Sequence, residues 1–481
     1  MLIFHPPMLM VMPVGQNYGV MMLRVIGVIS AAVLFSADGG EMRAATKVHE
    51  RAAEQTPPLD VVALLTAARG APPLICAFAA QSVRGYGWGN WNDAPSTPLA
   101  AVVTMPDRET GNATFPPADV DRLFEGLASA DPCVRELSVR LLGGQKSESI
   151  ASAFVTRLGS TDAPTREAAA FGLGLSQPAS AESALIQALR DAAAGVRANS
   201  AWALGRIADG RALAPLLGLF RDESEKVRLA AVVATGRMDS TSAVAALMRV
   251  VQNDPAPSVR RSAAWALGQL ESREAADVLA GVLGRDSDAK VREMSAWALG
   301  HMEGRNGKTA LTNALGKDAD DGVRETAAWA LAQIEDRSAV DALAAATADH
   351  SARVRGTVAW AIGQLRGDDE GSGSRVPPGL VRLLKDESED VRLKAAWSLG
   401  QIGDASALGA IQDALKLEQS SQVRRALVRA LIKSGGRSEA TMTELLNSSD
   451  PKVRESAVRG LAGHNSFNPW PWPWPRPRPF P

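Results

Sequence analysis

The chain has 481 residues and a formal net charge of −1, with 46% hydrophobic residues but only 2 Tyr and 10 Phe. Because Lys and Arg are matched by Asp and Glu, no global field attracts nucleic acid, and we expect no nucleic-acid partner. The two cysteines, Cys76 and Cys133, lack the spacing of a metal site, and the sequence leaves open whether they pair.

The first 37 residues are typical of a targeting segment. A short basic start at 21–24 precedes an apolar run at 25–35 and two small residues at 36–37. The run is short for a membrane span and fits the core of a signal peptide. Phe35 suits cleavage poorly, so a retained membrane anchor stays an alternative, as does a buried helix. A true start at Met21 or Met22 would explain the Met-rich residues before it. We expect an exported protein that is periplasmic, secreted or anchored.

Residues 38–116 form a linker and a small N-terminal cap region. Two helices are predicted at Leu59–Arg69 and Pro73–Arg84, separated by a Gly-Pro break at 70–73. A Gly-rich loop at 85–99 follows and carries Trp88 and Trp91. These rings either cap the apolar end of the first repeat or contact a ligand or partner.

A Val-Arg pair then recurs about every 31–32 residues, which indicates a stack of equal units rather than one globular core. Eleven units fill residues 117–463, with Thr165-Arg166 in the one slot that lacks Val. The other pairs begin at Val134, Val196, Val227, Val259, Val291, Val323, Val354, Val391, Val423 and Val453. One spacing is lengthened by residues 366–375, which we expect to form a surface loop.

Each unit is predicted to hold two antiparallel helices. In one unit these are Ser242–Val251 and Ser258–Leu270, joined by a turn that begins at Asp254. An Asp stands five residues before the Val in seven units, where it can accept backbone amides or meet the Arg after the Val. We expect a structural row of Asp and Arg, at Asp191, Asp222, Asp254, Asp286, Asp318, Asp349 and Asp386.

Helical geometry sorts the second helix when positions are counted from the repeat Val as 0. Positions 0, +4, +7, +8 and +11 lie on one side and carry Val, Ala, Ala, Leu and Ile or Leu, so we predict that this face is buried. The Gly at +9 is predicted to lie opposite that face.

The phrase VRxxAAWALGxI, with Asp five residues before it, resembles the HEAT-like repeats named after phycobilisome lyases. The resemblance implies an all-α, armadillo-like fold: an α-solenoid (superhelix) of about eleven two-helix repeats whose second helices line the concave side. Residues 464–481 are left as a disordered tail rich in Pro and Trp, with no assigned role.

The family that the chain resembles includes enzymes, but the metal-binding and catalytic motifs of those enzymes are missing from this sequence. Deoxyhypusine hydroxylases bind iron through His-Glu pairs within the repeats, but the only such pair here is His49-Glu50, outside them. HExxH, GxSxG and P-loop motifs are absent. We therefore expect no catalytic residue, no metal and no cofactor. A phycobilin-lyase-like or other repeat-family enzyme stays an alternative.

Trp stands at +6 in six units, and a polar residue stands at +10, one helical turn later. The rings are predicted to border the concave surface, as anchors for an extended protein or peptide, or else to fill the space between repeats. At Val423 and Val453, Arg429 and Arg459 replace Trp, as expected of a polar end cap. The candidate binding residues are Trp202, Trp265, Trp297, Trp329, Trp360, Trp397, Gln269, His301, Gln333, Gln364 and Gln401.

The sequence thus predicts a non-enzymatic scaffold that binds a protein or peptide on its concave face. Besides the enzyme, the alternative is a regulatory or sensor appendage of a membrane system, with the N-terminal segment as its anchor.

Overall fold

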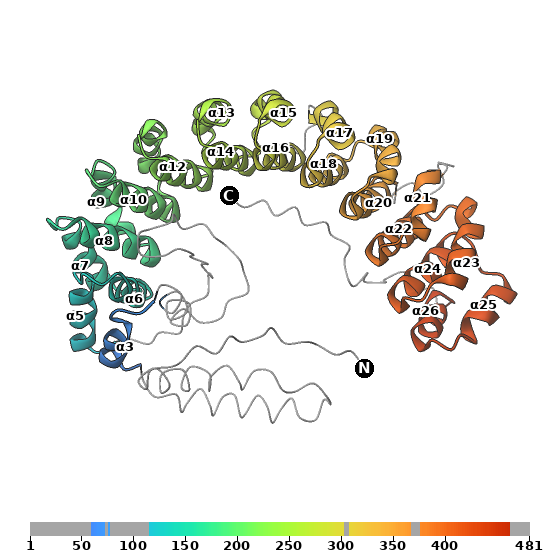
Figure 1. Ribbon diagram of the computed structural model, residues 1–481, viewed down its shortest axis with the longest axis horizontal. Coiled ribbons are helices and arrows are strands. Elements are labelled where there is room, and N and C mark those ends of the chain that lie inside the picture. The colour runs from blue at the N-terminus through green and yellow to red at the C-terminus, as the bar shows by residue number, and fades with distance from the viewer. Residues whose placement is uncertain (1–58, 73–75, 77–114, 303–306, 367–375, 462–481) are drawn as a thin grey trace. The chain divides into compact units, whose positions relative to one another are not determined.

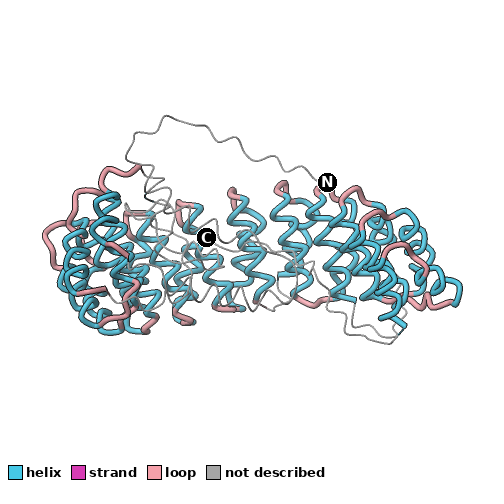
Figure 2. Tube along the Cα trace, turned by 90° about the horizontal axis from the view of Figure 1, so that it is seen from below, coloured by secondary structure: helices cyan, strands magenta, loops and turns pink. Residues whose placement is uncertain are grey.

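The computed structural model describes residues 59–72, 76, 115–302, 307–366 and 376–461. All regular structure in these ranges is helical (Figure 2), which confirms the all-α fold class. The chain divides into the units Met1–Asp60 and Val61–Pro481, and the repeats lie in the second. The predictions for the targeting segment, the loop with Trp88 and Trp91 and the tail fall outside the described residues. So does the loop predicted at 366–375, apart from Arg366, which is helical.

Eleven helix pairs follow one another in the described part of the second unit, as the sequence period predicts. The first helices are α5 (Pro117–Gly126), α7 (Glu148–Arg157), α9 (Glu182–Ala188), α11 (Leu213–Gly218), α13 (Val244–Asn253), α15 (Ala276–Arg285), α17 (Lys308–Lys317), α19 (Val340–Ala345), α21 (Pro378–Arg382), α23 (Leu408–Leu417) and α25 (Glu439–Leu446). The second helices are α6 (Pro132–Gly143), α8 (Ala163–Ser176), α10 (Ala194–Ile207), α12 (Glu225–Arg237), α14 (Pro257–Gln269), α16 (Ala289–His301), α18 (Asp321–Gln333), α20 (Ala352–Arg366), α22 (Glu389–Ile402), α24 (Ser421–Lys433) and α26 (Pro451–Leu461).

Short 3₁₀ turns flank many first helices and account for their small length. Those before a first helix are η2 (Ala179–Ala181), η3 (Gly210–Ala212), η5 (Thr241–Ala243), η6 (Arg273–Ala275), η8 (Arg337–Ala339) and η11 (Ala405–Ala407). Those after one are η4 (Leu219–Arg221), η9 (Ala346–Ala348) and η10 (Leu383–Lys385). The helices predicted at Ser242–Val251 and Ser258–Leu270 correspond to α13 and α14, and their predicted boundaries are correct to within two residues.

The second helices pack on one another from repeat to repeat and form the inner layer of this unit, with the first helices outside (Figure 1). Alanines with no exposed surface, such as Ala263, Ala298 and Ala330, let neighbouring helices approach closely. One core cluster extends from Val61 to Ala234 and another from Val232 to Ala457, so apolar packing continues along the stack.

The prediction that only one face of the second helix is buried is wrong. In α14 every residue from Ser262 to Gly268 is buried. The helix is flanked by its own first helix and by the second helices of both neighbouring repeats, so three sides are covered. The Gly at +9 consequently lies in a contact between repeats rather than opposite the buried face.

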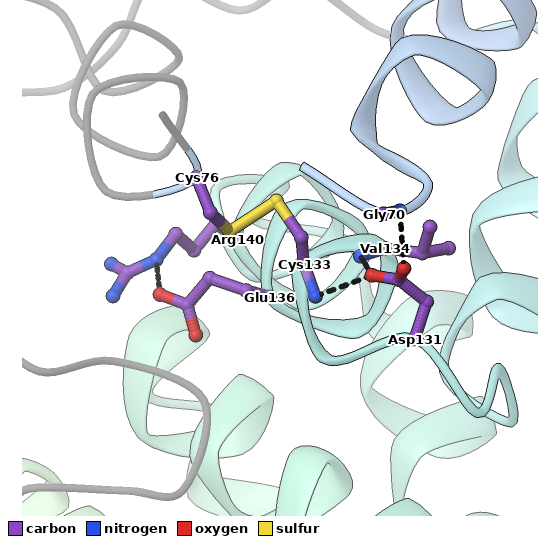
Figure 3. Close-up of a disulfide and its surroundings, with 7 residues drawn as sticks. All are labelled: Gly70, Cys76, Asp131, Cys133, Val134, Glu136 and Arg140. Carbon is purple, nitrogen blue, oxygen red and sulfur yellow. Dashed lines mark hydrogen bonds and ion pairs between the residues drawn. A yellow bond between two sulfur atoms is a disulfide. The ribbon is translucent and has the colours of Figure 1, made fainter. Parts of the chain in front are cut away.

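The N-terminal end is held by α3 (Val61–Ala68) and by a disulfide between Cys76 and Cys133, with Cα atoms 5.6 Å apart (Figure 3). Beside it the Asp131 carboxylate accepts hydrogen bonds from the Gly70 amide at 2.7 Å and from the Cys133 amide at 2.8 Å. The side chain of Asp131 caps the start of α6 while it ties the residues after α3 to the first repeat.

Candidate functional site on the inner layer

An arginine at +1 joins one repeat to the next along most of the stack. In α16, Arg292 donates from Nε and Nη2 to the two carboxylate oxygens of Asp318, both at 2.8 Å, and from Nη1 to the carbonyl of Asp286 at 2.9 Å. Two parallel bonds of this kind fix the geometry of the carboxylate. We call such an arginine–carboxylate pair between neighbouring repeats a clamp. The clamps are Arg166–Asp191, Arg197–Asp222, Arg228–Asp254, Arg260–Asp286, Arg292–Asp318, Arg324–Asp349, Arg355–Asp386 and Arg392–Glu418.

The row of Asp and Arg predicted from the sequence is confirmed, with one refinement. The Arg side chain reaches the Asp of the following repeat, and it bonds only to the backbone of its own repeat. Each Asp also accepts the amide two residues ahead, as Asp286 does from Asp288 at 2.9 Å. The clamp therefore fixes the turn of one repeat against the helix of another.

These contacts set the charge state of the clamp. Burial alone would raise the pKa of the Asp286 carboxyl, but hydrogen bonds from Arg260 and the Asp288 amide, with the charges of Arg260 and Arg292, hold it below its usual range. Because each of these arginines already has a carboxylate partner, the clamp row is not a groove for phosphate.

The indoles at +6 are packed between repeats. Trp202 and Trp360 are 2% exposed, and Trp265, Trp297 and Trp329 are 7% exposed, while Trp397 is partly buried. Each ring fits over the small residue at +9 of the preceding repeat. A Cβ added to Gly268 would lie 2.7 Å from Cζ3 of Trp297, and one added to Gly236 would lie 2.9 Å from that of Trp265. This packing explains why Gly recurs at +9.

The polar residues at +10 lie beside the indoles and reach the solvent. Gln269 and Gln364 are exposed, and His301, Gln333 and Gln401 are half-buried. The His301 ring stacks on Trp297, with centroids 4.8 Å apart and planes at 18°. The structure thus brings both groups of predicted residues onto one layer, with the polar groups as its accessible part. Whether a partner binds the indole row stays a prediction.

The N-terminal end of the layer carries charged residues that the sequence reasoning passed over. Arg140 lies over the Phe171 ring, Phe171 stacks on Trp202 with centroids 5.1 Å apart, and Arg206 also lies over the Trp202 ring. Burial raises the pKa of Glu167 to about 7, although Lys226 and Arg135 partly offset that effect. The signal that could have found Glu167 is its place at +2, directly before a stretch of α8 that consists of Ala, Phe, Gly and Leu.

No group of His, Cys, Asp or Glu side chains fit to hold a metal ion occurs in the part of the chain that the structure describes. Within the same ranges, no helix is both long and apolar enough to cross a membrane.

The paired helices, the shared core and the clamp between successive turns define an α-solenoid. Residues 151–234, 217–300, 309–374 and 376–462 match the HEAT repeats, and together they make up more than half of the sequence. The chain belongs to the HEAT-repeat family.

Comparison with other proteins supports the fold. The chain is similar to importin beta, with a TM-score of 0.57 at 14% identity over 89% of this chain and 66% of that one. It is also similar to the Kap95:Nup1 complex, with a TM-score of 0.52 at 14% identity over 73% and 58% of the two chains. An "Uncharacterized protein in gldA 3'region" of Geobacillus stearothermophilus is 36% identical over 55 residues, which are 11% of this chain and 26% of that protein.

Proposed function

We propose that this chain is a non-enzymatic scaffold that holds a protein or peptide partner on its inner layer. The observation that carries the proposal is the row of amides at Gln269, Gln333, Gln364 and Gln401. These side chains recur at one register, are exposed or half-buried, and form no hydrogen bond with any described residue.

A row of free amides suits an extended peptide. Each amide offers two donors and an acceptor, and equivalent helices stand about 10 Å apart, close to the length of three extended residues. The backbone of a partner segment would meet an amide in four of five consecutive repeats, and His301 in the fifth. The indoles beneath hold the helices at this spacing. The likeness to importin beta and to Kap95 supports the solenoid, and the Kap95 structure is that of a complex with another protein, Nup1.

The test uses the full chain and peptides selected from a random display library. We expect the selected peptides to bind the wild-type protein, and to lose about tenfold or more in affinity when the four amides are replaced by Ala. A matched control replaces four polar residues of the outer helices, Gln187, Gln252, Asn313 and Gln412. Peptides that bind the amide variant as tightly as the wild type would show that the site lies elsewhere.

We also propose that the protein works outside the cytoplasm. The Cys76–Cys133 disulfide supports this, because such bonds persist in oxidising compartments. Fractionation of native cells, with alkylation of free thiols before lysis, tests it. Full-length protein with reduced cysteines in the cytoplasm would contradict the proposal. The more specific kinship with the phycobilisome-lyase type of repeat also stays a proposal, and it rests on the VRxxAAWALG phrase alone.

A further inference from the structure

At +6 and +10 the tenth repeat carries cations where the central repeats carry indoles and amides. On α24, Arg425, Arg429 and Lys433 stand at +2, +6 and +10, so they lie along one line of the helix. Arg425 and Arg429 are half-buried and Lys433 is exposed. We call these three residues the basic row. No Asp or Glu occurs anywhere in α24.

Carboxylates on the neighbouring elements are already engaged. Glu418 bonds to Arg392, Asp450 bonds to Arg424, and Asp390 bonds to Lys394. On α26, Glu455 pairs with Arg459 of its own helix. Among the described residues, neither Arg425 nor Lys433 forms an ion pair.

A second half-buried arginine on the inner layer shows what a balanced site looks like. Burial lowers the pKa of Arg261, on α14, but the charges of Asp288 and Glu293 of the next repeat oppose that effect. The charge of Arg429 faces two further arginines, Arg425 and Arg459, and burial together with those charges lowers the pKa of Arg429. Like charges held together in this way repel one another, and a negative ligand placed between them would relieve that repulsion.

We propose that the basic row binds a short acidic segment of the partner protein. The row spans two helical turns, about 12 Å, which equals about four residues of an extended chain. That length suits a few Asp or Glu side chains, whereas specific contact with a nucleic-acid duplex needs more phosphate contacts over a longer surface. The inference rests on the proposed scaffold function and adds the chemistry of one part of the partner.

The test measures the fluorescence anisotropy of labelled hexaglutamate with the full chain at low and moderate salt. We expect the variant with Arg425→Gln, Arg429→Gln and Lys433→Gln to bind about tenfold or more weakly than the wild type. The matched control, Lys317→Gln with Lys385→Gln and Lys416→Gln, removes the same charge from exposed positions of the outer elements and should bind as the wild type does.

Thermal unfolding shows whether each variant is folded. If the triple variant fails to fold, Lys433→Glu alone changes an exposed residue and should still weaken binding. Equal loss in the control and the basic-row variants would overturn the inference, because only net charge would then matter. A labelled DNA duplex that bound more tightly than hexaglutamate, and that was lost in the same variant, would also overturn it. Neither result affects the peptide-binding test of Gln269, Gln333, Gln364 and Gln401. A failure of this inference can therefore be distinguished from a failure of the proposed scaffold function.

Discussion

The central repeats and the last two repeats are built alike at their turns but differ at position +6. From α14 to α20 an indole at +6 covers the small residue of the preceding repeat, whereas α24 and α26 place Arg429 and Arg459 there. An Arg of the +1 series still pairs with a carboxylate on both sides of this change, as Arg392 does with Glu418 and Arg424 with Asp450. The comparison teaches that the ion pairs at the turns attach neighbouring repeats. Position +6 of the inner layer can therefore carry either a packed indole or a charged arginine.

Acid should have the largest effect, because it removes many clamps together. The pKa values of eight carboxyls are lowered in the folded chain, so their stabilisation is fully present above the unfolded pKa, about 4, and is lost as pH falls through the folded pKa. These carboxyls are Asp191, Asp222, Asp286, Asp318, Asp349, Asp386, Glu418 and Asp450.

We therefore expect the melting temperature to fall steeply below about pH 4. The pKa of Glu167 is raised to about 7, so its contribution runs the other way and declines as pH rises from its unfolded value to about 7. A Glu167→Gln background removes that opposing effect. A melting temperature in this background that stayed constant down to pH 2 would show that the clamps contribute little.

Removing an indole should have the next largest effect. Trp297→Ala leaves a cavity beside Gly268 and should lower the free energy of unfolding by about 3–5 kcal/mol. Arg429→Ala, at the same register in α24, removes a half-buried side chain that is smaller than an indole and lies beside two other arginines, so it should cost clearly less. Urea unfolding of both variants measures the contrast. If Trp297→Ala lowered the free energy of unfolding only slightly, the indoles would not be needed for packing, and the prediction that they anchor a partner would be favoured.

Removing a clamp should cost more stability at the centre of the stack than at its end, but this difference should be smaller than the one between Trp297→Ala and Arg429→Ala. Asp318→Ala strands Arg292, which is 15% exposed, and should cost about 2–4 kcal/mol. Asp450 stands directly before α26 and caps its first turn, so Asp450→Asn, which keeps the cap, is the matched change. It removes a single 3.0 Å charged bond from Arg424, which is 29% exposed, and should cost about 1 kcal/mol or less. Urea unfolding measures both losses of stability. Equal losses would mean that the second hydrogen bond of the Arg292–Asp318 pair contributes nothing to stability.

The sequence predicts the helix pairs because its period is regular, and it predicts that Asp and Arg meet because each recurs in register. It does not show which repeat supplies the Asp, since a neighbour one period away looks the same along the chain. The burial of Gly at +9 escapes prediction, and the burial of Trp at +6 is left as one of two alternatives, because a helical wheel describes one helix and these residues are covered by neighbouring repeats. Pairing of Cys76 with Cys133 depends on how the chain returns to α6, which no local pattern records.

The smallest contrast comes from adding one methyl group at equivalent glycines. In the central repeats, a Cβ on Gly268 would lie 2.7 Å from Trp297 and 3.1 Å from Cα of Ala298, so a ring or a helix must shift. At the end of the stack, a Cβ on Gly400 would lie 3.3 Å from Cα of Ala430 and no closer to any other atom. Ala also favours a helix over Gly by about 0.5–1 kcal/mol.

We therefore expect Gly268→Ala to destabilise the chain by about 1–3 kcal/mol, through overpacking that exceeds the gain in helix propensity. Gly400→Ala should be neutral or stabilising by up to about 1 kcal/mol, because the propensity gain is opposed only by a slight displacement of Ala430. Urea unfolding of the two variants gives the difference directly. A loss of the same size at both positions would mean that α24 packs against α22 as tightly as the indole-bearing helices pack on their neighbours. The arginine at +6 would then fill the space that the indole leaves, and the basic row would owe its position to packing.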